Sequence, residues 1–193
     1  MKRITVFCGS SFGIDTDFEI QAKELGRKLA LENIELVYGG ANVGLMGAVA
    51  NGALEVSGNV IGVLPNFLKS KEIAHNGLTE LILVDSMHER KTKMNDLCDG
   101  VIALPGGFGT LEELFEMLTW GQLGLHKKPI GLLNINGFYN ELINFLDNMV
   151  HKGLLKDVNR KMVLVGDNID ELLEKMKTYE APSIEKWITN KTV

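Results

Sequence analysis

The stretch LPGGFGTLEELFEML, residues 104–118, joins an apolar run to an acidic, amphipathic segment through three glycines. A structural turn needs one glycine or two, so three of them behind a proline indicate that the backbone is shaped to approach a ligand. Leu111, Leu114, Phe115 and Leu118 recur at the spacing of one helix face. The stretch therefore reads as the end of a strand, a loop and a helix, which is the repeating unit of an α/β fold.

The rest of the chain alternates short apolar runs with longer amphipathic stretches. The apolar runs are mostly continuous, which is typical of strands in a parallel sheet covered on both faces. The expected strands are 3–7, 34–40, 59–65, 81–84, 100–105, 128–134 and 161–166. Besides the helix after the glycine loop, the expected helices are 15–32, 44–57, 86–98, 138–153 and 169–179.

This alternation predicts right-handed crossovers and so an α/β fold. The fold class that we expect is a single doubly wound Rossmann-like domain, with a mostly parallel sheet of about seven strands. The domain should occupy residues 1–180, followed by a C-terminal tail at 181–193. The stretch 66–80 is expected to be a loop, long enough to be functional.

Composition and charge exclude several classes of protein. The net charge of −5 argues against a general nucleic-acid binder, because phosphate neutralisation needs a basic surface. No run approaches the ~18 apolar residues of a membrane span, and no signal peptide is visible. Cys8, Cys98 and the four scattered histidines show no metal or redox spacing. We expect a cytoplasmic protein with no metal, no cofactor, no nucleic-acid partner and no membrane partner.

Three of the expected strands end in segments rich in glycine and small polar residues: 7–13, 38–47 and 104–110. Parallel strands share a direction, so their carboxyl ends lie at one edge of the sheet. Ligands of doubly wound folds bind outside that edge, at the point where the strand order reverses. The three segments are therefore predicted to converge on one binding site.

The glycine loop at 106–109 has two interpretations. Thr110 is placed to cap a helix, and a glycine loop that leads into a helix N-terminus is suited to hold a phosphate. Alternatively, Thr110 and Glu113 match a capping box, in which Glu113 bonds back to the backbone of Thr110 and the turn is only structural. The loop is not a Walker A motif, because no lysine follows the last glycine.

The other two motifs are weaker on their own. YGGANVGLMG at 38–47 lacks the strict G-x-G-x-x-G fingerprint and is equally compatible with a tight turn. In SMHERKTKM at 86–94, Arg90 could clamp a phosphate or carboxylate, or the basic residues could form a solvated helix face. Ser10 and Ser11 follow the first strand, and without an evident partner histidine they suit binding better than nucleophilic catalysis.

Taken together, PGGFGTLEE, GGANVGLMG and MHERK resemble the LONELY GUY family of cytokinin riboside 5′-monophosphate phosphoribohydrolases, long mislabelled as lysine decarboxylases. The family pattern P-G-G-x-G-T-x-x-E is met in full, and the resemblance covers most of the chain. It implies hydrolysis of the N-glycosidic bond of AMP or of N6-substituted, cytokinin-type adenosine 5′-monophosphates. The products would be a free base and ribose 5-phosphate. It also implies a homodimer, with residues of both subunits at the site.

The resemblance implies that Arg90 and Glu113 are catalytic. This suits N-riboside cleavage, whose oxocarbenium-like transition state needs a carboxylate near C1′ and a phosphate anchor that positions the sugar. The family motifs and the strand ends together give the expected substrate-binding residues. These are Gly9, Ser10, Gly39, Gly40, Met46, Glu72, Met87, Lys91, Pro105, Gly106, Gly107, Phe108, Gly109, Thr110, Glu112 and Thr119.

Other functions remain open from the sequence. The main alternative is a non-catalytic carrier of a nucleotide or of the molybdenum cofactor, since such Rossmann-like proteins resemble this family in their glycine loops. A dehydrogenase is weakened by the missing G-x-G-x-x-G. Lysine decarboxylation usually rests on pyridoxal phosphate held by a Schiff-base lysine, and no lysine here lies in a recognisable cofactor context.

Overall fold

The computed structural model describes residues 1–69 and 74–182. At its centre lies one seven-stranded sheet in the order β4-β3-β2-β1-β5-β6-β7, in which every pairing is parallel. The expected α/β fold with a parallel sheet is therefore confirmed. The strands are β1 (Arg3–Phe7), β2 (Glu35–Tyr38), β3 (Val60–Pro65), β4 (Glu80–Val84), β5 (Gly100–Ala103), β6 (Ile130–Leu133) and β7 (Val163–Gly166).

Helices connect successive strands. They are α1 (Thr16–Leu31), α2 (Gly44–Leu54), α3 (Asn66–Lys69), α4 (Met87–Leu97), α5 (Phe108–Gln122), the 3₁₀ turn η1 (Ile135–Gly137), α6 (Asn140–His151), α7 (Asp157–Arg160) and α8 (Ile169–Lys177). The short α3 lies where only a loop was expected, and η1 and α7 were not expected at all. Elements this short show no hydrophobic period from which a sequence could reveal them.

Two regions lie outside the described residues. Residues 183–193 include nearly all of the expected C-terminal tail, so the domain bounds of 1–180 and 181–193 stay a prediction. Residues 70–73 belong to the expected loop at 66–80 and include Glu72. Among the residues that are described, no helix is long and apolar enough to cross a membrane.

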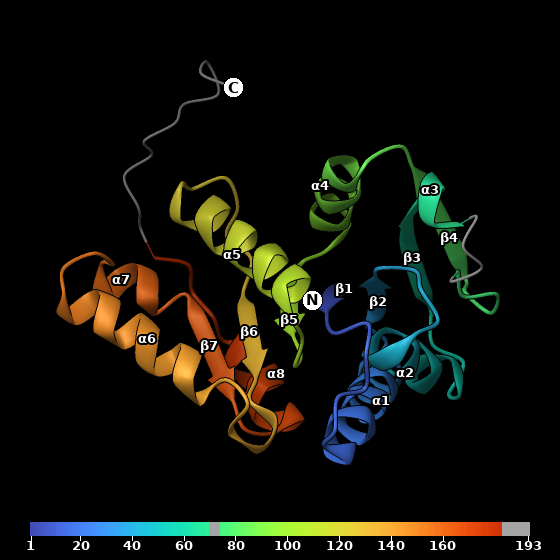
Figure 1. The fold of residues 1–193 in the computed structure, drawn as a ribbon, viewed down its shortest axis with the longest axis horizontal. Coiled ribbons are helices and arrows are strands. Elements are labelled where there is room, and N and C mark those ends of the chain that lie inside the picture. The colour runs from blue at the N-terminus through green and yellow to red at the C-terminus, as the bar shows by residue number, and fades with distance from the viewer. Residues whose placement is uncertain (70–73, 183–193) are drawn as a thin grey trace.

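The helices form two layers, one on each face of the sheet (Figure 1). Buried side chains of α1, α2 and α8 pack on one face, together with Leu36 and Tyr38 of β2. Those of α4, α5 and α6 pack on the other, together with Val37. Alternate side chains of a single strand thus enter two separate cores, which is why the strands read as continuous apolar runs.

The strand order reverses at β1, which lies between β2 and β5. The loops that follow these three strands contact one another there. The amide of Gly9 donates to the carbonyl of Pro105 at 3.0 Å, and the amide of Leu45 donates to the carbonyl of Gly9 at 3.1 Å. The predicted convergence of the three glycine-containing segments is therefore confirmed, at the place where doubly wound folds bind ligands.

His75 connects the chain after α3 to this edge of the sheet. Its amide donates to the carbonyl of Gly40 at 3.0 Å. In its buried ring, Nδ1 accepts from the amide of Gly77 at 3.0 Å and Nε2 lies 3.0 Å from Asn51 Oδ1. Because Nδ1 accepts, the ring is neutral and Nε2 donates to the amide oxygen of Asn51. Burial lowers the pKa of His75 below its ordinary value.

We therefore expect the protein to lose stability as the pH falls below about 6.5, the ordinary pKa of histidine. The folded state binds fewer protons than the unfolded state in that range, so the free energy of unfolding decreases with falling pH. The slope is at most about 1.4 kcal/mol per pH unit for each histidine. Thermal unfolding between pH 7.5 and 5.5 measures it. His75→Gln should show a shallower dependence, and an unchanged slope in that variant would contradict this role of His75.

Candidate active site

Helix α4 brings a basic side chain to the switch point, the place at the carboxyl edge of the sheet where the strand order reverses. Its first turn is capped by Ser86, whose Oγ accepts the amide of Glu89 at 3.1 Å. The Glu89 carboxylate in turn accepts the amide of Asp85 at 2.8 Å. These bonds fix where the helix begins, and Arg90 follows one turn later. The guanidinium of Arg90 extends over the carboxyl end of β3, where Nε donates to the carbonyl of Val63 at 3.1 Å.

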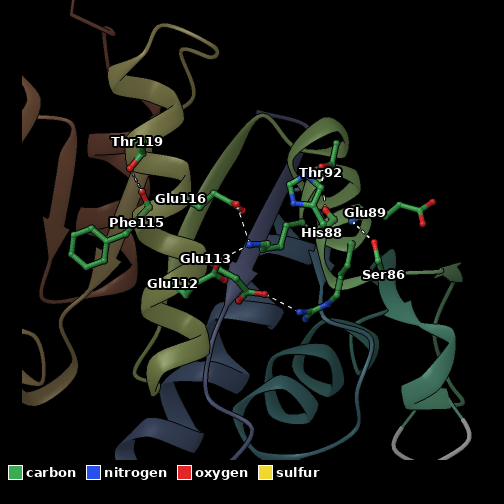
Figure 2. Close-up of polar contacts among 11 residues, drawn as sticks. Ser86, His88, Glu89, Thr92, Glu112, Glu113, Phe115, Glu116 and Thr119 are labelled. Carbon is green, nitrogen blue, oxygen red and sulfur yellow. Dashed lines mark hydrogen bonds and ion pairs between the residues drawn. The ribbon is translucent and has the colours of Figure 1, made fainter. Parts of the chain in front are cut away.

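A second bond from this guanidinium reaches α5. Nη1 of Arg90 donates to Oε1 of Glu113 at 2.9 Å, and each of the two side chains is only 11% exposed. Figure 2 shows the carboxylates of Glu112, Glu113 and Glu116 turned from α5 toward α4. The two residues expected to be catalytic, which lie far apart in the sequence, thus form one ion pair shielded from water.

Burial and the neighbouring charges have opposing effects on the pKa of Glu113. Burial raises its pKa above the ordinary value, the charge of Arg90 opposes that rise, and the charge of Glu112 adds to it. A carboxylate with a raised pKa is a stronger base than an exposed one, and a desolvated carboxylate interacts more strongly with positive charge. Glu113 can therefore stabilise a cationic transition state or accept a proton from water.

The structure corrects two expectations about the start of α5. The helix begins at Phe108 with Gly107 as its N-cap residue, so Thr110 is not the cap. The capping box is wrong as well, because the carboxylate of Glu113 binds Arg90 instead of turning back to Thr110. Gly107 has the extended backbone conformation of an N-cap residue, with φ −95° and ψ −152°, so the helix starts three residues before the position expected from Thr110 as cap. Thr110 is therefore buried inside the first turn.

The loop before α5 presents backbone without side chains. A Cβ on Gly106 would lie 2.1 Å from Oγ1 of Thr110, so only glycine fits there. A Cβ on Gly107 or Gly109 would meet nothing within 4 Å, so both face open space. The backbone amides of the first turn of α5, and the positive end of the helix dipole, adjoin this loop, an arrangement that suits an anion. Phe108 is 94% exposed beside it.

A cavity of about 320 Å³ adjoins this loop. Ser10, Gly106 and Gly107 line it, as do Phe18 and Phe138, whose ring centroids are 5.5 Å apart. Gly9 and Pro105 also line it. It combines open backbone groups with an apolar wall, which is the usual composition of a small-molecule site.

Lys91 is held between two carboxylates of α5. Its Nζ lies 2.5 Å from Oε1 of Glu112 and 3.0 Å from Oε1 of Glu116. The hydrogen bond to Glu112 is the main reason why the pKa of Lys91 is raised. Lys91 and Glu112, both expected to bind substrate, thus lie together beside the Arg90–Glu113 pair. Glu116 was not expected from the sequence, although its spacing of four residues from Glu112 places both on one helix face.

Apart from Thr119, the remaining expected residues fall into three groups. Gly39, Gly40 and Met46 lie at the carboxyl end of β2 and the start of α2, and a Cβ on Gly39 would meet both Arg90 and Met46. Met87 is exposed in the first turn of α4. Glu72 lies outside the described residues.

Thr119 is the expected residue that the structure does not bring to this site. On α5 it lies about 9 Å further along the helix axis than Glu113 and about a third of a turn away. Its hydroxyl donates to the carbonyl of Phe115 at 2.7 Å. Figure 2 shows Thr119 and Phe115 on the side of α5 away from the ion pair. Both line an apolar groove of about 210 Å³ between α5 and α6, which Leu146, Met149 and Leu154 also line.

The sequence did not indicate one hydrogen-bond partner of Arg90, the carbonyl of Val63, because a backbone group leaves no trace in the residue pattern.

The two cysteines are buried, and burial raises the pKa of the thiols of both Cys8 and Cys98. Within residues 1–69 and 74–182, no group of three or more His, Cys, Asp or Glu side chains could hold a metal ion.

Comparisons with known proteins identify relatives of this chain. The model of a family described as "Possible lysine decarboxylase" matches residues 46–176. The cytokinin riboside 5′-monophosphate phosphoribohydrolase LOG7 of Arabidopsis thaliana is 44% identical over 192 residues, covering 100% of this chain and 88% of that protein. The probable enzyme of this name LOGL2 from Oryza sativa subsp. japonica is 44% identical over 97% of this chain and 77% of its own.

Among solved structures, the molybdenum cofactor binding protein of Rippkaea orientalis superimposes with a TM-score of 0.70. It is 27% identical over 92% of this chain and 97% of its own. The Moco carrier protein of Chlamydomonas reinhardtii has a TM-score of 0.70 at 23% identity, over 91% of this chain and 94% of its own, and shows the fold alone.

Proposed function

Because this chain belongs to the family described as possible lysine decarboxylases, and its full-length relatives are named as cytokinin riboside 5′-monophosphate phosphoribohydrolases, we infer that it is a phosphoribohydrolase. It hydrolyses the N-glycosidic bond of an adenosine 5′-monophosphate, either AMP or an N6-substituted form, to free base and ribose 5-phosphate. The observation that carries this proposal is the buried Arg90–Glu113 pair beside an open glycine loop at the switch point.

In the proposed mechanism, Glu113 acts on the reacting carbon. As the bond from C1′ to the base breaks, its electron pair leaves with the base and positive charge builds on C1′ and the ring oxygen. The desolvated carboxylate of Glu113 stabilises this charge and accepts a proton from the attacking water, whose oxygen forms the new bond to C1′. The departing base takes up a proton from solvent, and Glu113 returns its proton to solvent, so the carboxylate is restored. Arg90 keeps the carboxylate ionised against the effect of burial and holds it in one position through the 2.9 Å bond.

The glycine loop anchors the other end of the nucleotide. The amides of Gly107, Phe108 and Gly109 at the start of α5 bind the 5′-phosphate. Because a phosphate bound there is fixed relative to the backbone, its binding energy positions the sugar for attack. Lys91 and Glu112 bind substrate at the neighbouring face of α5.

The name of the family finds no support at this site. A decarboxylase of that kind needs a lysine of lowered pKa that forms a Schiff base with pyridoxal phosphate. Lys91, the lysine beside the ion pair, is bound to two glutamates and its pKa is raised.

We further propose a homodimer in which the groove at Thr119 faces the partner. Thr119 lies away from the ion pair of its own chain, in a groove whose Phe115 and Leu154 are 36% and 81% exposed. Burial of that apolar surface against a second copy would stabilise the dimer and would place Thr119 near the partner's site. The cytoplasmic location stays a prediction.

A carrier of a nucleotide or of the molybdenum cofactor is the second candidate, because the Rippkaea orientalis protein is similar in fold at 27% identity. A carrier would use the same loop and cavity, but it has no need of a desolvated carboxylate.

Incubation of the protein with AMP, with isopentenyladenosine 5′-monophosphate and with adenosine tests the proposal. Chromatography should show free base and ribose 5-phosphate from at least one nucleotide, in equal amounts. Adenosine should react far more slowly, because it lacks the anchoring phosphate. Tight binding of both nucleotides without release of base would favour the carrier instead.

A further inference from the structure

Gly39 lies directly against the guanidinium of Arg90, at the residue that follows β2. A Cβ built on Gly39 would lie 2.2 Å from Nη2 of Arg90 and 3.4 Å from its Cζ. It would also lie 3.0 Å from Sδ of Met46. A side chain of any size at this position would therefore overlap with the guanidinium.

Space, and not backbone conformation, is the reason why glycine is needed at this position. The φ angle of Gly39 lies outside the left-handed region, so any residue could adopt its backbone conformation. The next residue, Gly40, differs in this respect because its φ is +77°. The two adjacent glycines, which the sequence presents as one motif, are thus required for different physical reasons.

The guanidinium has little freedom to move aside. Nε is bound to the carbonyl of Val63 at 3.1 Å, and Nη1 to Glu113 at 2.9 Å. Val63 belongs to β3, which is paired with β2 on one side and with β4 on the other, so its carbonyl cannot follow a displaced side chain. Relief of the overlap at Gly39 requires a shift of about 1 Å, which is enough to lengthen a hydrogen bond beyond its usual range.

We propose that Gly39 is a positioning residue: the space left by its missing side chain holds one end of the Arg90 guanidinium, and so sets the position of the Glu113 carboxylate. From the sequence, Gly39 was expected to contact the substrate. The proposed positioning role is instead indirect, because Gly39 acts through Arg90. The catalytic part of the inference rests on the proposed function, whereas the packing part does not.

The test is a double-mutant cycle that joins Gly39→Ala with Arg90→Lys. Lysine lacks the Nη2 atom with which the new Cβ would collide, so the overlap is absent from the double variant. The matched control is Gly100→Ala at the opposite edge of the sheet, where a Cβ would also lie 3.0 Å from a methionine sulfur, that of Met1. Each protein is measured for its unfolding midpoint and for kcat and KM of base release.

In the wild-type background we expect Gly39→Ala to lower kcat about 100-fold, because a misplacement of about 1 Å has effects of that size. Its unfolding midpoint should fall by about 5 °C, as for a modestly overpacked core site. In the Arg90→Lys background the same substitution should change kcat less than about threefold and the midpoint by no more than Gly100→Ala does.

Equal effects of Gly39→Ala in the two backgrounds would overturn the inference, because Gly39 would then act without Arg90. Effects no larger than those of Gly100→Ala in both backgrounds would overturn it too. If the wild-type protein released no base, the proposed function would fail. The unfolding midpoints of the four proteins in the double-mutant cycle would still decide whether Gly39 positions Arg90.

Discussion

Replacement of Glu113 with glutamine should reduce base release by about 1,000-fold while the protein stays folded. Glutamine has nearly the same shape, and its Oε1 can still accept the hydrogen bond from Arg90 that Glu113 accepts at 2.9 Å. What the variant loses is the negative charge. Removal of one preorganised charge or one proton acceptor typically lowers a rate by 10²- to 10⁴-fold.

Binding and catalysis can be separated in this variant. The 5′-phosphate is proposed to bind the loop at 106–110 and not the carboxylate, so the Kd for AMP measured by calorimetry should change only a few-fold. The activity loss should therefore appear in kcat and not in KM. Equal losses in affinity and in kcat/KM would instead make Glu113 a binding residue.

A suitable control makes the same chemical change elsewhere. Glu55, at the end of α2, pairs with Lys23 at 2.6 Å, and its side chain is 50% exposed. An exposed pair of this kind contributes about 0–1 kcal/mol to stability. Glu55→Gln should therefore keep full activity and nearly the same unfolding midpoint. If the Glu113→Gln protein were as active as this control, the proposed catalytic role of Glu113 would be wrong.

The sequence was sufficient to predict a parallel sheet of about seven strands and the convergence of three of its loops, but not the strand order. Seven apolar runs separated by amphipathic segments admit few arrangements, because parallel strands need crossovers of one hand. Once the strands are parallel, the segments after β1, β2 and β5 must lie at one edge. The bonds from Gly9 to Pro105 and from Leu45 to Gly9 at that edge follow from the topology.

The group that the Glu113 carboxylate binds could not be predicted from the sequence. The pattern S/T-x-x-E occurs both at Thr110–Glu113 and at Ser86–Glu89, and either could cap a helix. In the structure Ser86 is the cap and Thr110 is not, because Gly107 already turns the chain into α5. Only the packing of α4 beside α5 decides that Glu113 faces Arg90. This tertiary packing cannot be predicted from a short sequence motif.

Replacement of Arg90 with alanine should have the largest combined effect on activity and stability. It removes the group that holds Glu113, so base release should fall by at least about 100-fold. It also leaves a buried carboxylate without its partner, which typically costs about 3–5 kcal/mol in the free energy of unfolding. As a control, Arg160→Ala breaks a pair in which the partner Asp147 is 58% exposed, and it should cost far less.

The pH dependence of the Arg90→Ala variant identifies the cause of its instability. Burial already raises the pKa of Glu113, and the loss of the opposing charge raises it further. A carboxyl whose pKa is higher in the folded state loses stability as the pH rises above its ordinary pKa of about 4.5, and regains it on acidification. The difference in unfolding midpoint between wild type and variant should therefore shrink as the pH falls from 7.5 toward 5.

The double variant Arg90→Ala, Glu113→Gln provides the decisive comparison. It removes the uncompensated charge, so at pH 7.5 it should be more stable than Arg90→Ala alone, although the activity of both should be strongly reduced. If the double variant were instead less stable than the single one, the two losses would be additive contributions from packing. The 2.9 Å contact would then not be the ion pair that holds this carboxylate in place.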